Sequence, residues 1–200
     1  VFRNKIYGLT AATTGAATLL SGIRATAGTS THNIYNNTIS FDNALTGVNN
    51  GDAIRGISVA STAVNSSINV AYNTIYLNAS STGANFGTSG VWHAASGVST
   101  TARLDLRNNI ILNLSTPAGT GITSALRRSA GSVYNNYLST SNRNLLYAGT
   151  PGATNAILND NGTAISNFAT FQTTVSPRES NSFTDEGFAY STPGSFFISL

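Results

Sequence analysis

The sequence has no cysteine, no methionine and a single lysine, Lys5. The absence of cysteine excludes disulfides, thiolate metal sites and cysteine nucleophiles. No apolar run approaches the length that a membrane-spanning helix needs, so we expect no membrane span. Because the first residue is valine rather than methionine, we expect the chain to be a processed product or an excerpt of a longer protein.

Charged residues are also scarce, at 8% of the chain against about 25% in ordinary soluble domains. The net charge is only +3, and the nine arginines are scattered apart from Arg127 and Arg128. A nucleic-acid-binding domain presents a dense basic face, so we expect no nucleic-acid partner. Glutamate and lysine, which are strong helix formers, are too rare to support extensive helical surfaces.

The composition that remains is rich in small polar and β-branched residues, which favour strands and turns. Apolar residues make up 40% of the 200 positions, which is enough for one core. The sequence therefore predicts an all-β protein.

An internal repeat organises most of the chain. An asparagine followed two positions later by an apolar residue recurs at intervals of 33, 36, 36 and 27 residues, at Asn4, Asn37, Asn73, Asn109 and Asn136. Apolar residues also stand three positions before each asparagine, at Val1, Ile34, Val70, Leu106 and Val133. A second marker keeps nearly the same period, at Gly22-Ile23, Gly56-Ile57, Gly90-Val91 and Gly121-Ile122. Two markers with one period indicate a repeat architecture.

Around each asparagine, apolar side chains fall at alternate positions, which is the period of a strand. Stacking the repeats pairs each strand with its equivalent about 4.8 Å away. The sequence thus predicts a parallel solenoid of about five coils, with inward columns such as Ile6, Ile39, Ile75, Ile111 and Leu138. We expect the five asparagines to occupy a bend, where asparagine tolerates left-handed backbone angles, and to form a hydrogen-bonded ladder. The glycines are expected to mark a second bend.

The segments "HNIYNNTISF", "NVAYNTIYLN", "LDLRNNIILNL" and "SVYNNYLST" resemble the right-handed parallel β-helix repeats of the pectate-lyase-like superfamily. They are most similar to non-catalytic versions in large secreted bacterial surface proteins. The resemblance covers residues 1–148 and implies a right-handed, single-stranded parallel β-helix at an extracellular or bacterial cell-surface location. That superfamily includes lyases, hydrolases, epimerases, phage tailspikes and adhesins, so the resemblance does not fix an activity.

Residues 149–200 depart from the repeat. Helix-like spacing of Ile165, Phe168, Phe171 and Val175 predicts a short amphipathic helix, with Thr163 as its N-cap and Pro177 just past its end. Alternation at Phe196, Ile198 and Leu200 predicts a last strand. This segment either covers the open end of the last coil or forms an excursion before further coils.

Two groups of residues are candidate ligand contacts. Arg103, Asp105 and Arg107 alternate with inward leucines, so they face outward together and suit a carboxylate-bearing sugar. The alternative is a surface ion-pair stripe that contributes little energy. Trp92 is expected to face outward beside Arg24, Ser58 and Thr123, where it either stacks on a sugar ring or is covered by a loop.

The sequence lacks a recognisable catalytic cluster, because no second carboxylate stacks on Asp105 in the repeat register. We expect no cofactor and no metal, and we expect His93 to be an interior histidine with satisfied hydrogen bonds. The predicted function is a non-catalytic structural or adhesive segment of a bacterial surface protein, whose partners are further copies stacked end to end or extracellular glycans. The alternative is a carbohydrate-binding or polysaccharide-cleaving module that uses Trp92, Arg103, Asp105 and Arg107.

Overall fold

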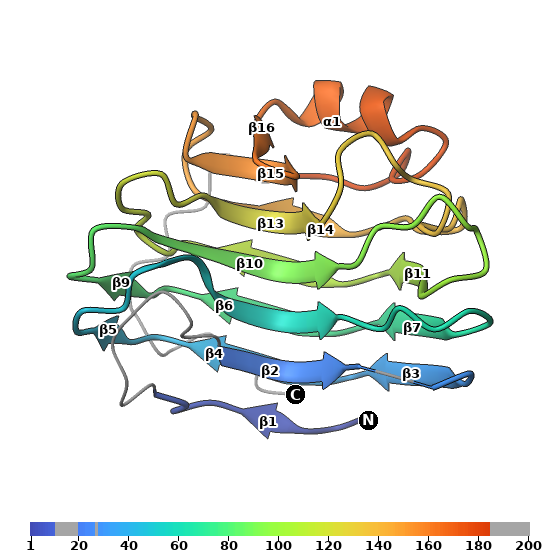
Figure 1. Cartoon of the computed structure of the whole chain (residues 1–200), viewed down its shortest axis with the longest axis horizontal. Helices are drawn as coiled ribbons and strands as arrows, with labels where there is room; N and C mark the ends of the chain where they lie inside the picture. Colours follow the sequence, from blue (N-terminus) through green and yellow to red (C-terminus); the bar gives the residue numbers. More distant parts are fainter. Residues whose placement is uncertain (11–19, 27, 185–200) are drawn as a thin grey trace.

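The computed structural model describes residues 1–10, 20–26 and 28–184, and these form a β-solenoid of about four turns with one short helix. The coils lie one above another, and the parallel strands of successive coils build the walls (Figure 1). This arrangement confirms the predicted all-β parallel β-helix.

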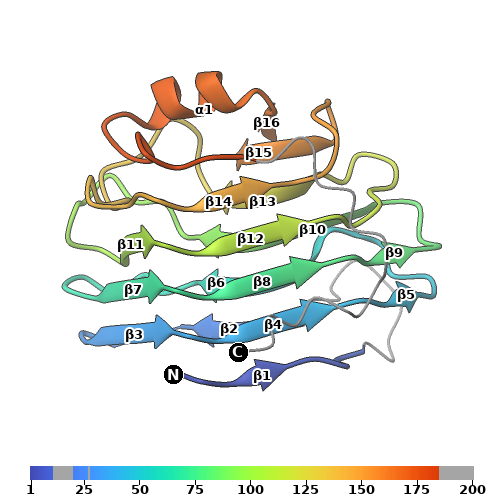
Figure 2. The same cartoon turned by 180° about the vertical axis from the view of Figure 1, so that it is seen from behind.

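Three sheets form the walls of the solenoid (Figures 1 and 2). The largest contains β2 (Leu20–Ala25), β6 (Asn50–Val59), β10 (Phe86–His93), β13 (Thr123–Arg128), β15 (Asn155–Asp160) and β16 (Thr163–Ile165). A three-stranded sheet contains β3 (Thr31–Tyr35), β7 (Ser67–Ala71) and β11 (Arg103–Arg107). The five-stranded sheet contains β1 (Lys5–Ile6), β4 (Thr38–Phe41), β8 (Thr74–Leu77), β12 (Ile110–Asn113) and β14 (Leu145–Tyr147). A small extra pair joins β5 (Ala44–Leu45) and β9 (Ser80–Ser81).

The inward columns are in register over the regular coils. Ile39 pairs with Ile75, and Ile75 pairs with Ile111, in the five-stranded sheet. All three are fully buried. In the three-stranded sheet, Ile34 and Val70 are register partners. These columns confirm the predicted stacking and supply the apolar burial that stabilises the fold.

The sequence-based register fails at the last predicted coil. Leu146, not Leu138, pairs with Ile111 in the five-stranded sheet. Correspondingly, Asn144 rather than Asn136 follows Asn109, at an interval of 35 residues. The second marker shifts in the same coil, because Val91 pairs with Leu126 and not with Ile122.

The bend before the five-stranded sheet has left-handed residues one position earlier than predicted. The residue before each ladder asparagine has φ between 54° and 60°, and these residues are Arg3, Asn36, Tyr72, Asn108 and Arg143. Each such residue costs about 1 kcal/mol of backbone strain. Because every coil adopts the same bend, the ladder asparagines come into line above one another.

Of the glycines predicted to mark a second bend, Gly22 in β2, Gly56 in β6 and Gly90 in β10 instead lie within strands of the largest sheet, and a close approach requires glycine there. A Cβ on Gly56 would lie 2.4 Å from Cγ2 of Ile75 and 2.6 Å from the carbonyl oxygen of Gly90. Neither distance is tolerable, since packed interiors have no spare room. The glycine therefore lets the largest sheet approach the isoleucine column of the five-stranded sheet.

The parallel arrangement continues beyond residue 148. Leu158 of β15 pairs with Leu126 of β13, and β16 then pairs with β15 in the antiparallel direction. The helix α1 (Phe168–Val175) follows and lies over this end of the solenoid (Figure 1). Its Phe171 and Val175 are buried in the core.

The helix confirms part of the prediction for this segment and corrects the rest. Pro177 lies just past its end, as expected. The N-cap is Asn167, whose side chain accepts a hydrogen bond from the backbone of Thr170. Thr163, the predicted N-cap, instead begins the strand β16. The strand predicted at Phe196, Ile198 and Leu200 lies outside the described residues.

Candidate functional site

An asparagine ladder runs the length of the described solenoid. The side-chain Nδ2 of each asparagine donates to the Oδ1 of the next at 2.9–3.0 Å, through Asn4, Asn37, Asn73, Asn109 and Asn144. The last four of these residues are buried. Because an amide both donates and accepts, a column of them satisfies its own polar groups inside the wall.

The ladder ends on a carboxylate that the sequence did not reveal. Asn144 Nδ2 lies 2.9 Å and 3.1 Å from the two carboxylate oxygens of Glu179. Tyr137 and Ser182 also donate their hydroxyls to Glu179. Burial raises the pKa of Glu179, and these three hydrogen bonds oppose that rise. An ionised carboxylate only accepts hydrogen bonds, so it is a suitable last acceptor for a ladder whose donors all point one way.

Asn136 has a different role from the one predicted. It is fully buried, and its side-chain amide donates to the carbonyl oxygens of Ala94 and Thr101, both at 2.8 Å. Its Oδ1 accepts a hydrogen bond from the Arg128 side chain at 3.0 Å. Asn136 therefore satisfies backbone groups of the preceding coil rather than extending the ladder.

His93 and Arg128 form a polar contact inside the solenoid. They are register partners on β10 and β13, and both side chains are buried. His93 Nε2 lies 2.7 Å from the carbonyl oxygen of Ala102, and Nδ1 contacts the Arg128 guanidinium. A guanidinium can only donate a hydrogen bond and a carbonyl oxygen can only accept one. The Nε2 atom of His93 therefore carries the proton, and its Nδ1 atom accepts from Arg128.

The electrostatics of this pair keep His93 neutral. Burial, and secondly the charge of Arg128, lower the pKa of His93 to about 3. Burial also lowers the pKa of Arg128 to about 10, so that the guanidinium stays charged at neutral pH. The prediction that His93 is an interior residue with satisfied hydrogen bonds is confirmed. The buried arginine beside it was missed, because the predicted register aligned Val91 with Ile122 rather than with Leu126.

Two of the three residues predicted to face outward on β11 form an ion pair. Arg107 Nη2 lies 2.8 Å from Oδ2 of Asp105, and Thr140 donates a hydrogen bond of 3.0 Å to Oδ1. The Asp105 side chain is only 9% exposed, whereas that of Arg107 is 49% exposed. Asp105 stacks on Asn69 and Asn33 in the register, as the sequence indicated. Arg103 begins the same strand and is half-buried.

Trp92 faces outward on a different sheet. Its register partners are Ser58 and Arg127 on the largest sheet, so the predicted neighbour Thr123 is replaced by Arg127. The Arg55 guanidinium lies over the indole, 4.0 Å from the ring centroid. The cover over this tryptophan is therefore an arginine of the preceding coil, at a distance typical of a cation–π contact.

Arg55 is itself held by Asp52. The Arg55–Asp52 salt bridge is 2.8 Å long, Arg127 lies 3.5 Å from the same carboxylate, and Ser89 donates a hydrogen bond to it. Burial lowers the pKa of Arg127, and Asp52 opposes that change. The two groups of candidate carbohydrate contacts lie on different sheets. Arg103, Asp105 and Arg107 share the three-stranded sheet, and Trp92 lies on the largest sheet.

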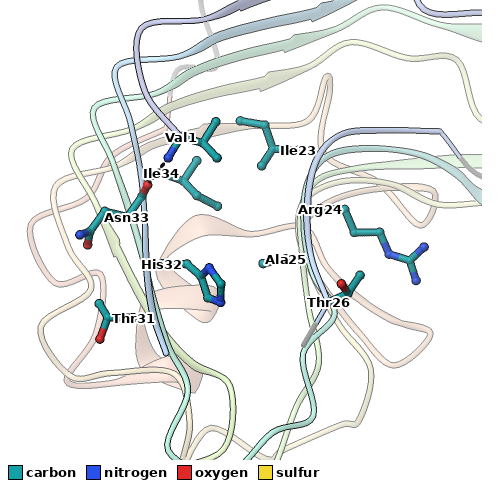
Figure 3. Close-up of a pocket in the computed structure, with 9 residues that line it drawn as sticks. All are labelled: Val1, Ile23, Arg24, Ala25, Thr26, Thr31, His32, Asn33 and Ile34. Carbon is teal, nitrogen blue, oxygen red and sulfur yellow. Dashed lines mark hydrogen bonds between the residues drawn. The ribbon is translucent and has the colours of Figure 1, made fainter. Parts of the chain in front are cut away.

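A pocket of about 330 Å³ opens at the first coil, where β2 is the edge of the largest sheet (Figure 3). His32 and Ile34 of β3 face Ala25 and Ile23 of β2 across it, while Arg24 points away from the interior. His32 contacts the Ser30 hydroxyl at 2.9 Å. Among the described residues, this pocket lies at the N-terminal end of the solenoid interior.

Comparison with models of known protein families, with curated proteins and with solved structures found no match to this chain. Within residues 1–10, 20–26 and 28–184, no cluster of three or more histidine, cysteine, aspartate or glutamate side chains is suited to hold a metal ion. Nor does that part of the chain contain a helix with the length and apolar character to cross a membrane.

Proposed function

We propose that this chain is a non-catalytic structural and adhesive segment of a secreted or surface-attached bacterial protein. The observation that carries the proposal is the unbroken ladder from Asn4 to Glu179, which ties every coil to the next. A solenoid built in this way is a stiff spacer whose length grows by about 4.8 Å per coil. The resemblance of the repeats to those of bacterial surface proteins supports the location.

The described carboxylates support a structural role. Asp52 binds arginines, Asp105 binds Arg107 and Thr140, and Asp160 accepts from the Tyr134 hydroxyl at 2.6 Å. Glycoside cleavage uses two carboxyl groups that flank one substrate bond. Here Asp52 and Asp105 belong to different sheets. Each carboxylate forms ion pairs or hydrogen bonds with other side chains of the protein.

The covered C-terminal end favours a single rod over a fibre of stacked copies. Head-to-tail stacking needs accessible strand edges at both ends of the unit. In the described part of the chain, β16 and α1 lie over one end. We therefore propose that this segment acts within one molecule, and that size-exclusion chromatography with light scattering finds monomers.

Adhesion and catalysis are tested together. Beads coated with the native protein should be retained on cell layers, whereas beads coated with heat-unfolded protein should wash off. Incubation with neutral and acidic polysaccharides should release no new reducing or unsaturated ends. Equal retention of both bead types would overturn the adhesive role. Product release that disappears in Asp105→Asn or Asp52→Asn would overturn the non-catalytic assignment.

A further inference from the structure

A stack of aromatic rings begins on the outer face of the three-stranded sheet. Phe2 forms a parallel bridge with Tyr35, and their rings stack with centroids 5.1 Å apart and planes 3° apart. This separation is close to the spacing of about 4.8 Å between coils. The planes of the two rings are therefore roughly perpendicular to the solenoid axis, and each of these two coils contributes one ring.

The stack is interrupted one level further on. The register partner of Tyr35 in the next coil is Ala71, and the partner of Ala71 in the coil beyond is Arg107. A methyl group leaves the space beside the second face of Tyr35 unfilled. On the far side of this gap lies the Arg107 guanidinium, half exposed and held by Asp105.

The gap is part of a pocket of about 340 Å³ lined by Tyr35, Ala71 and Arg107, with Asn36 and Tyr72 from the adjacent bends. That volume is within the range of small-molecule sites. Tyr72 is 62% exposed. The backbone positions of Tyr35 and Arg107 are two register steps apart, which corresponds to about 9.6 Å. A flat ring at the level of Ala71 would thus lie one coil spacing, about 4.8 Å, from the levels of Tyr35 and Arg107.

We propose that this pocket binds a planar aromatic ring that carries an anionic substituent. Aromatic faces attract one another at centroid separations of about 4.5–7 Å, and a guanidinium attracts a ring within about 6 Å. The exposed part of Arg107 pairs with the anionic group, as guanidinium groups do with carboxylates. The proposal rests on this stack alone and does not depend on the structural role of the solenoid.

The test uses 4-hydroxybenzoate as the probe, measured by saturation-transfer NMR and by calorimetry. Cyclohexanecarboxylate supplies the same charge without a flat ring, and glucuronate supplies it on a sugar ring. We expect saturable binding of 4-hydroxybenzoate in the low millimolar range, as suits a ligand of this size. Neither of the other two compounds should bind as tightly.

The decisive variant is Ala71→Phe, which fills the gap with a ring of the protein itself and should abolish binding. Its matched control is Ser67→Phe, which adds the same ring on the same face of β7, four residues away, and should bind normally. Tyr35→Leu should weaken binding about fivefold, because stacking is lost. Circular dichroism checks that each variant is folded.

Several results would overturn the proposal. Absence of saturable binding by the wild type would do so directly. Equal affinity for cyclohexanecarboxylate would mean that charge pairing alone operates, and tighter binding of glucuronate would mean that the pocket takes a sugar. Binding that survives in Ala71→Phe would place the ring elsewhere on the molecule.

Discussion

The buried His93 should make the folded state sensitive to acid. The pKa of His93 is about 3 in the folded protein, against about 6.5 in an unfolded chain. A base whose pKa is lowered by folding contributes stability that is complete above pH 6.5. That stability is lost as the pH falls towards 3, because the unfolded chain binds the proton more readily.

The size of the effect follows from those two values. Each pKa difference of one corresponds to about 1.4 kcal/mol, so the full loss below pH 3 amounts to about 5 kcal/mol. Between pH 8 and pH 5 the expected loss from His93 is about 2 kcal/mol. The side chains that face the imidazole are those of Arg128, Tyr137 and Asn136. A variant at position 93 keeps all three of them.

The assay is urea unfolding of the wild type and of His93→Gln at pH 8 and pH 5. The glutamine lowers stability at both pH values, because it cannot reproduce all the contacts, but it does not titrate. The wild type should therefore lose about 2 kcal/mol more than the variant between the two pH values. If both lose the same free energy, His93 is not held neutral by its surroundings and the reasoning fails.

Three other predictions concern the ladder, the close contact at Gly56 and the single tryptophan. Asn109→Ala leaves buried donors unpaired and should lower the free energy of urea unfolding by about 2–3 kcal/mol. The control Asn69→Ala removes an exposed asparagine pair and should lower it by less than about 0.5 kcal/mol. Equal losses would refute a special role for the ladder. Gly56→Ala should lower the free energy of unfolding by about 2–3 kcal/mol, because the added Cβ clashes with Ile75 and Gly90. The control Gly97→Ala, where a Cβ meets nothing within 4 Å, should leave the thermal melt nearly unchanged. Arg55→Gln should increase iodide quenching of the tryptophan fluorescence, because the guanidinium that covers the ring is removed; unchanged quenching would contradict that contact.

The regular coils could be predicted from sequence because each repeats the same residue types at the same bends. Ile39, Ile75 and Ile111 are spaced by 36 residues, and they are register partners in the structure. The prediction failed at the last coil because its interior is partly polar. Three positions before Asn144 stands Ser141, a buried serine that accepts from the backbone of Leu106 at 3.0 Å. Val133 before Asn136 imitated the apolar pattern instead.

The candidate sites were harder to predict for a related reason. Alternation along β11 correctly placed Arg103, Asp105 and Arg107 on one face, because a single strand fixes that relationship. Whether Trp92 shares their face depends on how the loops turn between sheets. The pocket beside Tyr35 could not be predicted from the sequence. It exists because Ala71 is small, and this matters only once Tyr35 and Arg107 are known to be its register partners.

The register of the coils is tested most directly by engineered disulfides, since the chain has no cysteine of its own. Thr31 and Ser67 are register partners, so cysteines at both positions should be about 4.8 Å apart and should cross-link under mild oxidation. Cysteines at Asn33 and Ser67 are displaced by two residues along the strand, at about 8 Å, and should remain reduced. In the last coil, cysteines at Ile110 and Leu145 should cross-link, whereas cysteines at Ile110 and Tyr137 should not. Cross-linking of the displaced pairs in preference to the register pairs would contradict the stacked solenoid on which the account rests.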